Sequence, residues 1–110
     1  MKVSDVVERL GWRVLAGADE LEAEINGGYA ADLLSCVMAG AEAGDLWITL
    51  QTHTNIVAVA SLLGLSAIVV AENAVVPDST LQKAEQQTMP LLSSPDPVYE
   101  TIVQLITLGI

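Results

Sequence analysis

Apolar and polar positions along the chain fall into short hydrophobic runs and stretches with helical spacing, so the pattern predicts strands and helices in turn. Residues 46–50 (Leu-Trp-Ile-Thr-Leu) are apolar and rich in β-forming residues, as expected of a covered central strand. Residues 56–71 carry no charge, and their character changes from Ala and Leu to the β-branched run 68–70. This stretch is shorter than the roughly 20 residues that a membrane span needs. We expect a helix, a tight turn and a strand within it.

Helix and strand signals divide the rest of the chain in the same way. We expect helices over residues 4–10, 33–41, 78 or 79 to 87, and 98–106, and strands over residues 12–16, 23–26 and 89–92. Ser4, Asp32 and Asp96 are placed to cap three of these helices through a side-chain oxygen. Gly27 and Gly28 are expected in a loop, because no phosphate-binding glycine motif surrounds them.

The order of these elements predicts an α/β fold with a mostly parallel sheet. Three strand and helix pairs follow residue 44 with short connections, and such pairs form parallel strands joined by right-handed crossovers. The carboxyl ends of parallel strands lie on one edge of a sheet, which is where open α/β sheets bind ligands. Polar residues follow these strands at 51–55, 72–73 and 93–94, so we expect them to be neighbours.

The polar stretch 51–55 is the strongest candidate binding site in the chain, because a helix should begin there and present its N–H groups. The predicted ligand-binding residues are Gln51, Thr52, His53, Thr54, Asn55, Asn73 and Ser93. For His53 two interpretations remain: a helix-start residue bonded to a neighbouring loop, or a ligand contact. The expected ligand is a small molecule or an anion, and no particular cofactor is indicated.

No set of residues predicts catalysis or metal binding. His53 is the only histidine and Cys36 the only cysteine, so neither a zinc set nor an internal disulfide can form. Cys36 lies among the apolar positions of helix 33–41, which predicts a buried, inert thiol. A single cysteine fits a reducing cytoplasm, and the acidic residues near the N-terminus argue against a signal peptide.

The chain is strongly acidic, with 14 Asp and Glu against 4 Lys and Arg among 110 residues and a formal charge of −10. This charge repels phosphate backbones and argues against binding to nucleic acid or to an anionic membrane. Four acids gather within residues 19–24, and we interpret them as a solvated edge because their spacing defines no metal-ligand set.

From about residue 27 onward the sequence resembles the DRTGG domain family, whose module is similar to the N-terminal domain of HPr kinase. The resemblance rests on residues 28–38 (GYAADLLSCVM), on residues 44–60 (GDLWITLQTHTNIVAVA) and on the helix unit at 77–90. It implies that residues 1–110 form a single DRTGG-like domain, a three-layer α/β/α sandwich. DRTGG modules occur beside CBS domains in larger proteins and also alone, which implies a regulatory or ligand-sensing role.

Two hypotheses for function follow. The first is a non-catalytic regulatory module that binds a small molecule or an anion at the carboxyl edge of its sheet. The second is a protein-interaction subunit that docks on a larger enzyme and has no ligand of its own. A homodimer is expected with either, because 52% of the residues are hydrophobic and some helix face should need covering.

Overall fold

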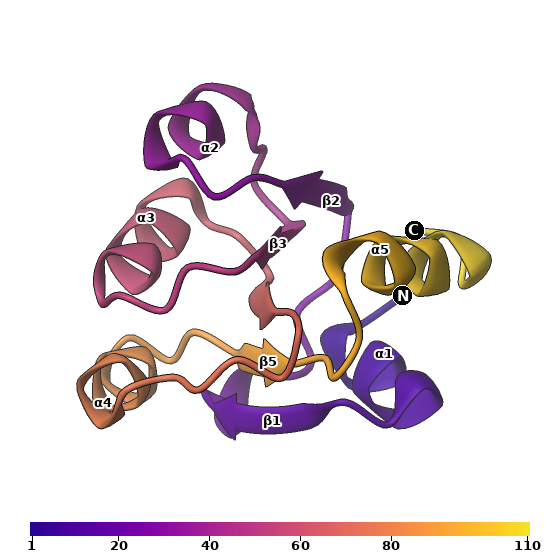
Figure 1. Ribbon diagram of the computed structural model, residues 1–110, viewed down its shortest axis with the longest axis horizontal. Coiled ribbons are helices and arrows are strands. Elements are labelled where there is room, and N and C mark those ends of the chain that lie inside the picture. Colours follow the sequence, from indigo (N-terminus) through magenta and orange to yellow (C-terminus); the bar gives the residue numbers. More distant parts are fainter.

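Five strands form one sheet in the order β1-β5-β4-β3-β2 in the computed structural model, which describes all 110 residues (Figure 1). The strands are β1 (Arg13–Ala16), β2 (Gly27–Ala30), β3 (Asp45–Thr49), β4 (Ala67–Val70) and β5 (Leu91–Ser93). The helices are α1 (Val3–Leu10), α2 (Leu34–Gly40), α3 (Asn55–Leu63), α4 (Asp78–Gln86) and α5 (Val98–Thr107). A 3-10 turn, η1 (Ala18–Glu20), follows β1.

Four of the strands are parallel, which confirms the predicted mostly parallel sheet. Strands β2, β3, β4 and β5 pair side by side in the same direction, and a helix connects each to the next. Strand β1 pairs antiparallel with β5, so the start of β1 lies beside the end of β5, with Arg13 opposite Ser93. This reversal brings a residue from the beginning of the chain to the carboxyl edge of the other four strands.

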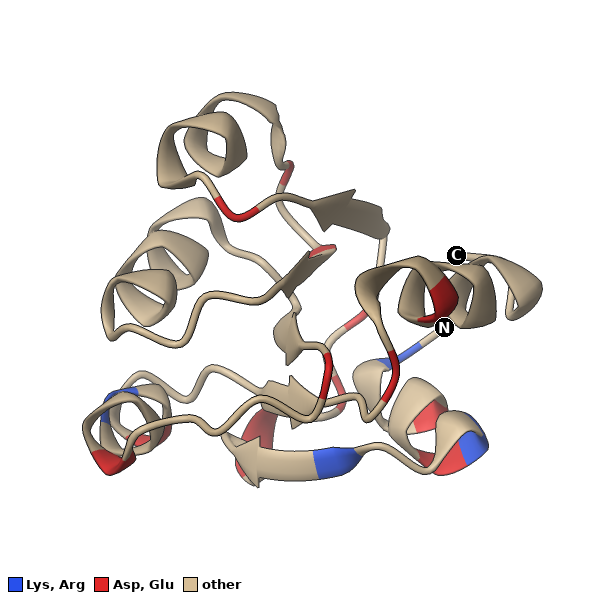
Figure 2. Cartoon of the chain, in the orientation of Figure 1, with Lys and Arg blue, Asp and Glu red and all other residues tan.

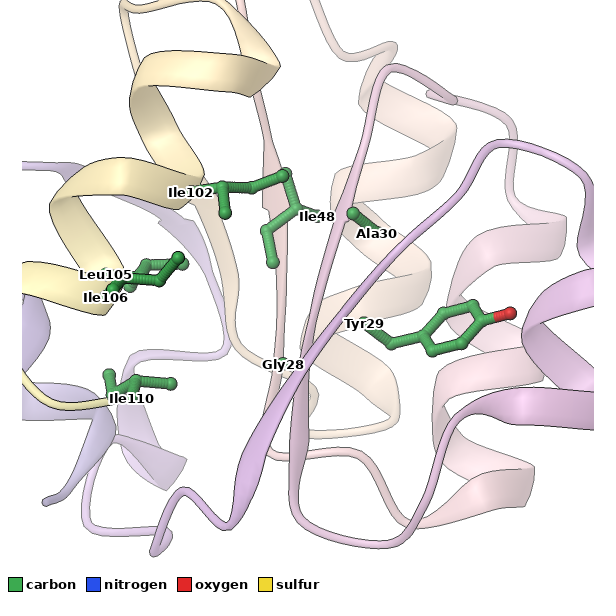
Figure 3. Close-up of a pocket in the computed structure, with 8 residues that line it drawn as sticks. All are labelled: Gly28, Tyr29, Ala30, Ile48, Ile102, Leu105, Ile106 and Ile110. Atoms are coloured by element: carbon green, nitrogen blue, oxygen red, sulfur yellow. The ribbon is translucent and has the colours of Figure 1, made fainter.

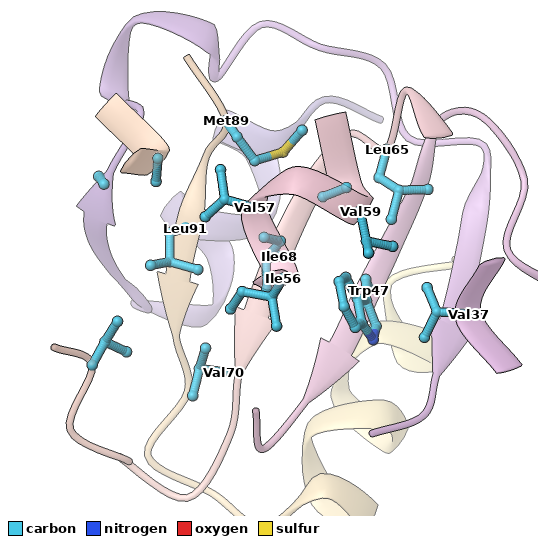
Figure 4. Close-up of a cluster of buried hydrophobic side chains, with 14 residues drawn as sticks. Val37, Trp47, Ile56, Val57, Val59, Leu65, Ile68, Val70, Met89 and Leu91 are labelled. Atoms are coloured by element: carbon cyan, nitrogen blue, oxygen red, sulfur yellow. The ribbon is translucent and has the colours of Figure 1, made fainter. Parts of the chain in front are cut away.

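Helices cover both faces of the sheet, as the three-layer prediction requires. Helices α2, α3 and α4 lie on one face, while α1 and α5 lie on the other (Figure 1). Residues that alternate along each strand face the two layers in turn. Trp47, Ile68 and Leu91 belong to the apolar cluster under α2, α3 and α4 (Figure 4), and Leu46 and Val69 belong to the cluster under α1 and α5. None of the five helices combines the length and the apolar character that a membrane crossing requires.

The predicted strand at 23–26 and the predicted loop at Gly27 and Gly28 are both wrong. Residues 23–25 run beside the N-terminus, where Val3 N–H donates to the Ala23 carbonyl over 3.0 Å. Strand β2 instead begins at Gly27 and pairs with β3. A Cβ on Gly27 would lie 3.0 Å from an Asp45 carboxylate oxygen, so the glycine allows the close approach of these two strands.

The three predicted helix caps are also wrong. Helix α1 begins at Val3, ahead of Ser4, and α2 begins at Leu34, two residues after Asp32. Pro97 takes the capping position of α5 without a side-chain hydrogen bond, whereas the Asp96 carboxylate accepts a hydrogen bond from Gln104 Nε2 at 2.6 Å. Each helix begins within one or two residues of the predicted position, but none of the three side chains accepts a hydrogen bond from a backbone N–H of the helix that it was predicted to cap.

Helix α2 is more exposed than its apolar pattern predicts. Leu33 is 64% exposed and Met38 is 51% exposed, and only Val37 is buried within the helix. Cys36 is exposed as well, so the predicted buried thiol is wrong. The reason is position: α2 covers the β2 end of the sheet and has a neighbouring helix, α3, on one side (Figure 1).

Candidate functional site

The carboxyl ends of the four parallel strands bring the predicted polar segments to one edge of the sheet. Thr49 of β3 pairs with Val70 of β4, and Val70 pairs with Ser93 of β5. The segments 51–55, 72–73 and 93–94 therefore begin at the same edge, as the topology predicts. The structure adds two polar residues that were not predicted to lie on this edge, Asp32 after β2 and Arg13 at the start of β1.

Asp32 ties the end of β2 to the end of β3. Its carboxylate oxygen Oδ1 accepts hydrogen bonds from Thr49 Oγ1 and from the backbone N–H of Leu50, each at 2.8 Å. Thr49 Oγ1 in turn accepts from the backbone N–H of Gln51 at 3.1 Å, and the Gln51 side chain is exposed. The turn that leads into segment 51–55 is thus held by a charge-assisted network.

His53 completes the start of α3. Its Nδ1 accepts a hydrogen bond from the backbone N–H of Asn55 at 3.1 Å, and Thr54 Oγ1 lies 3.4 Å from the same nitrogen. The imidazole therefore satisfies one of the N–H groups that a helix start leaves unpaired, in the way that a capping oxygen does. The predicted bond to a neighbouring loop is not present. The ring is exposed, and its Nε2 makes no hydrogen bond within the protein.

Thr54 and Asn55 open into a cavity of about 370 Å³ between α3 and α4, together with residues of α4. The other lining residues are Ala58, Ser79, Gln82, Lys83 and Gln86. Thr52 holds the two helical segments together, because its carbonyl accepts a hydrogen bond from the buried Thr80 Oγ1 at 2.7 Å. This cavity is polar and contains one cationic side chain, Lys83.

Asn73 lies in a second cavity, of about 290 Å³, beside β1. Arg13 Nη2 donates a hydrogen bond to Asn73 Oδ1 at 3.0 Å. The two residues are 60 positions apart in the chain, so only the antiparallel pairing of β1 with β5 brings them together. Arg13 is the only Lys or Arg in β1, and Figure 2 shows the start of this strand in blue. Of the predicted ligand residues, Thr54 and Asn55 therefore line one cavity and Asn73 lines another. The other four, Gln51, Thr52, His53 and Ser93, line neither cavity.

Ser93 is the one predicted site residue that is buried, with 2% of its surface exposed. Its Oγ makes no hydrogen bond within the protein. Ser94 is buried on the other face, where its hydroxyl and that of Thr101 of α5 lie 2.8 Å apart. A buried hydroxyl without a partner costs free energy. Ser93, which carries the unpartnered hydroxyl, lies directly opposite Arg13 in the β1–β5 register.

Ionisable groups elsewhere define no further centre. No three His, Cys, Asp or Glu side chains lie together as a metal site would require. One pKa departs clearly from its ordinary value: a hydrogen bond and the negative charge of Glu22 raise the pKa of Lys2. This pair is exposed and belongs to the acidic segment near the N-terminus, in keeping with the interpretation of that segment as a solvated edge.

A third cavity, of about 180 Å³, is almost entirely apolar and lies on the α5 face of the edge strand β2 (Figure 3). Its lining residues are Gly28, Tyr29, Ala30, Ile48, Ile102, Leu105, Ile106 and Ile110. The Tyr29 ring points away from the isoleucines (Figure 3), and its hydroxyl donates to the Cys36 carbonyl at 3.0 Å. Ile106, at the rim of this lining, is 62% exposed.

Comparison with solved structures identifies the type of fold. The chain is similar to the CBS and DRTGG domains of the regulatory region of a Clostridium perfringens pyrophosphatase, solved in complex with the activator diadenosine tetraphosphate. The TM-score is 0.73 at 15% sequence identity, and the match covers 94% of this chain and 46% of that chain. The fold is therefore DRTGG-like, which confirms the resemblance. No protein-family model and no curated protein matches the sequence.

Proposed function

We propose that residues 1–110 form a single DRTGG-like domain that senses a small-molecule or anionic ligand at the carboxyl edge of its sheet and performs no catalysis. One observation carries the proposal: four parallel strands end in polar residues on this edge, which borders two partly polar cavities. Ligands of open α/β sheets bind at this position. The similar pyrophosphatase structure is of a regulatory region bound to an activator, which supports a regulatory role here.

Thermal unfolding against a panel of nucleotides, phosphates and carboxylates tests this proposal. A ligand at one hundred times its Kd adds about 2.7 kcal/mol to the free energy of unfolding, which for a domain of this size raises Tm by roughly 10 °C. We expect at least one panel member to produce such a rise. His53→Asn retains a hydrogen-bond acceptor at the start of α3 but removes the imidazole, so it separates ligand contact from helix capping. Asn55→Ala removes an amide side chain that lines the α3–α4 cavity and keeps the backbone N–H that donates to His53, so it tests ligand contact there.

A panel without any stabilising ligand would contradict the sensing function, provided that the unliganded protein unfolds cooperatively. Neutral behaviour of His53→Asn and Asn55→Ala toward a ligand that does bind would remove segment 51–55 from the site. The ligand would then belong to another part of the edge.

The apolar cavity favours the second candidate, a protein-interaction role that includes a homodimer. Strand β2 is an open edge without any charged residue, and Ile106 and Val103 of α5 beside it are 62% and 45% exposed. Open apolar edges are sites of association. The same surface could receive a larger enzyme, and the exposed, unpaired Cys36 is compatible with a reducing cytoplasm.

Light scattering tests the homodimer, with an expected mass of twice the 11.6 kDa of the chain. Ile106→Glu places a charge beside the apolar cavity and should shift the equilibrium toward monomer by at least about tenfold, the effect of roughly 1.4 kcal/mol. Leu62→Glu is the matched control, because Leu62 is 73% exposed on α3, on the opposite face. A mass of 11.6 kDa at millimolar concentration would contradict the homodimer.

A further inference from the structure

The cavity beside Arg13 combines one cationic group with apolar walls. Arg13 and Asn73 supply its polar groups and are joined by their 3.0 Å hydrogen bond. The remaining lining residues are Leu15, Ala74, Val75, Val76 and Leu81. At about 30 Å³ for each water-sized group, the 290 Å³ cavity has room for roughly ten non-hydrogen atoms.

The Arg13 guanidinium has no carboxylate partner in a chain that is rich in carboxylates. The ion pairs of the structure join the N-terminus to Glu24 and Lys2 to Glu22. A guanidinium has five N–H donors, and Arg13 uses one contact, to Asn73 Oδ1. The remaining donors can bind a carboxylate through two parallel hydrogen bonds, which is the strongest arrangement available to arginine.

The backbone beneath the cavity holds Asn73 in place. Glu72 and Asn73 both have positive φ, 59° and 52°, a conformation that is uncommon outside glycine but that asparagine tolerates best. Their N–H groups donate to the Asp96 carbonyl at 2.8 Å and to the Ser94 carbonyl at 2.9 Å. The Asn73 amide therefore positions the Arg13 guanidinium before any ligand arrives, which lowers the entropy cost of binding.

The apolar walls and the local charge restrict the ligand class. Val75 is 89% exposed beside the cavity, whereas Val76 is 9% exposed, so an aliphatic ligand would cover surface that now faces water. Glu72 flanks the site in the chain and Asp78 begins α4. With one guanidinium and these carboxylates nearby, a second or third negative charge on the ligand would be repelled.

We infer that this cavity binds a small aliphatic monocarboxylate, with its carboxylate on Arg13 and its hydrocarbon part against Leu15, Val75 and Leu81. The inference rests on the proposed ligand-sensing function and names the class of ligand and the residue that selects it. Arg13 distinguishes a carboxylate from its uncharged amide, and the apolar walls distinguish a branched chain from acetate.

Calorimetric titration and amide NMR of the full chain test this inference with 4-methylpentanoate as the probe. Its uncharged analogue 4-methylpentanamide, acetate, inorganic phosphate and ATP are the comparison ligands. We expect 4-methylpentanoate to bind at least about tenfold more tightly than any of them, and to shift the amide signals of Leu15 and of residues 74–76. Arg13→Gln should weaken binding by about tenfold to a hundredfold, the range for a hydrogen bond to a charged group.

Arg9→Gln is the matched control, because it removes the same charge from an exposed position on α1 and should leave the affinity within about twofold. Val75→Asp is a second variant at a solvent-exposed position, where the fold should be preserved, and it should weaken binding by charge repulsion. Equal losses in Arg13→Gln and Arg9→Gln would overturn the inference, as would tighter binding of phosphate or ATP than of 4-methylpentanoate.

The outcome separates this inference from the proposed function. If another panel ligand binds at segment 51–55 and Arg13→Gln leaves its affinity unchanged, while 4-methylpentanoate does not bind, the inference is overturned and the sensing function stands. If neither the probe nor any panel ligand binds, both are overturned.

Discussion

Replacement of Trp47 by alanine is expected to lower the free energy of unfolding by about 4 kcal/mol, close to the whole stability of a marginal domain. Trp47 lies in the middle of β3 with none of its surface exposed, and it belongs to the cluster beneath α2, α3 and α4 (Figure 4). Alanine would leave a cavity that the packed strands on both sides cannot close. Urea denaturation followed by circular dichroism measures the loss.

Trp47→Phe is the matched variant for this prediction. Phenylalanine keeps an aromatic ring in the core but cannot donate the hydrogen bond that Trp47 Nε1 makes to the Ala31 carbonyl at 2.8 Å. We expect the free energy of unfolding to fall by about 1–2 kcal/mol. Hydrogen exchange at the Leu50 N–H should also become faster, because this N–H donates to the carboxylate of Asp32, the residue that follows Ala31. A loss below about 2 kcal/mol in Trp47→Ala would contradict the central role of this side chain.

Gly17→Ala is expected to lower the free energy of unfolding by more than about 3 kcal/mol or to prevent folding. Gly17 follows β1 with φ of 73°, and a Cβ there would lie 2.3 Å from the Met89 carbonyl oxygen. That oxygen belongs to the backbone that leads into β5, so it cannot move without disturbing the β1–β5 pairing. The Gly17 N–H also donates to a Glu85 carboxylate oxygen, which fixes its position further.

Gly11→Ala separates the clash at Gly17 from the general cost of positive φ. Gly11 ends α1 with φ of 69°, and a Cβ there would meet nothing within 4 Å. We expect a loss of about 1 kcal/mol, the usual cost of the left-handed region for alanine. Chemical denaturation of the two variants side by side checks the difference. Equal losses would show that steric contact at Gly17 is unimportant.

The substitutions at Trp47 and at Gly17 both act on elements that position the carboxyl edge of the sheet. Trp47 holds the end of β2 against β3, and the Gly17 turn holds β1 beside β5. The pairing of β2 with β3 supports the turn after β3 that the Asp32 carboxylate holds, and the pairing of β1 with β5 places Arg13 opposite Ser93. Binding measurements on destabilised variants therefore need conditions in which the protein remains fully folded.

Local sequence patterns predicted the centre of the fold well. The run 46–50, the uncharged stretch 56–71 and the short connections between them define β3, α3 and β4 within one residue at most ends. Parallel order followed from the alternation of strands and helices, and with it the placement of segments 51–55, 72–73 and 93–94 on one edge. These predictions succeed because buried parallel strands and their crossover helices depend on apolar periodicity within each segment.

The pattern failed where a partner distant in sequence decides the structure. Gly27 and Gly28 have no strand propensity, yet they form β2 because β3 offers a full row of hydrogen-bonding groups beside them. Asp32 and Asp96 carry the signal of helix caps, but the Asp32 carboxylate bonds to the end of β3 and the Asp96 carboxylate bonds to the Gln104 side chain further along α5. Cys36 and Met38 fit an apolar stripe, yet α2 lies at the end of the layer and leaves both exposed.

The sequence by itself determined the α/β class, the parallel order of the central strands and the polar character of the edge, because each depends on residue type and spacing along a continuous stretch. Tertiary structure alone decided which polar groups share a cavity. Arg13 faces Asn73 because β1 returns antiparallel beside β5. The direction of β1 and the side-chain partners between distant segments depend on the packing of the whole sheet, and no local pattern encodes them.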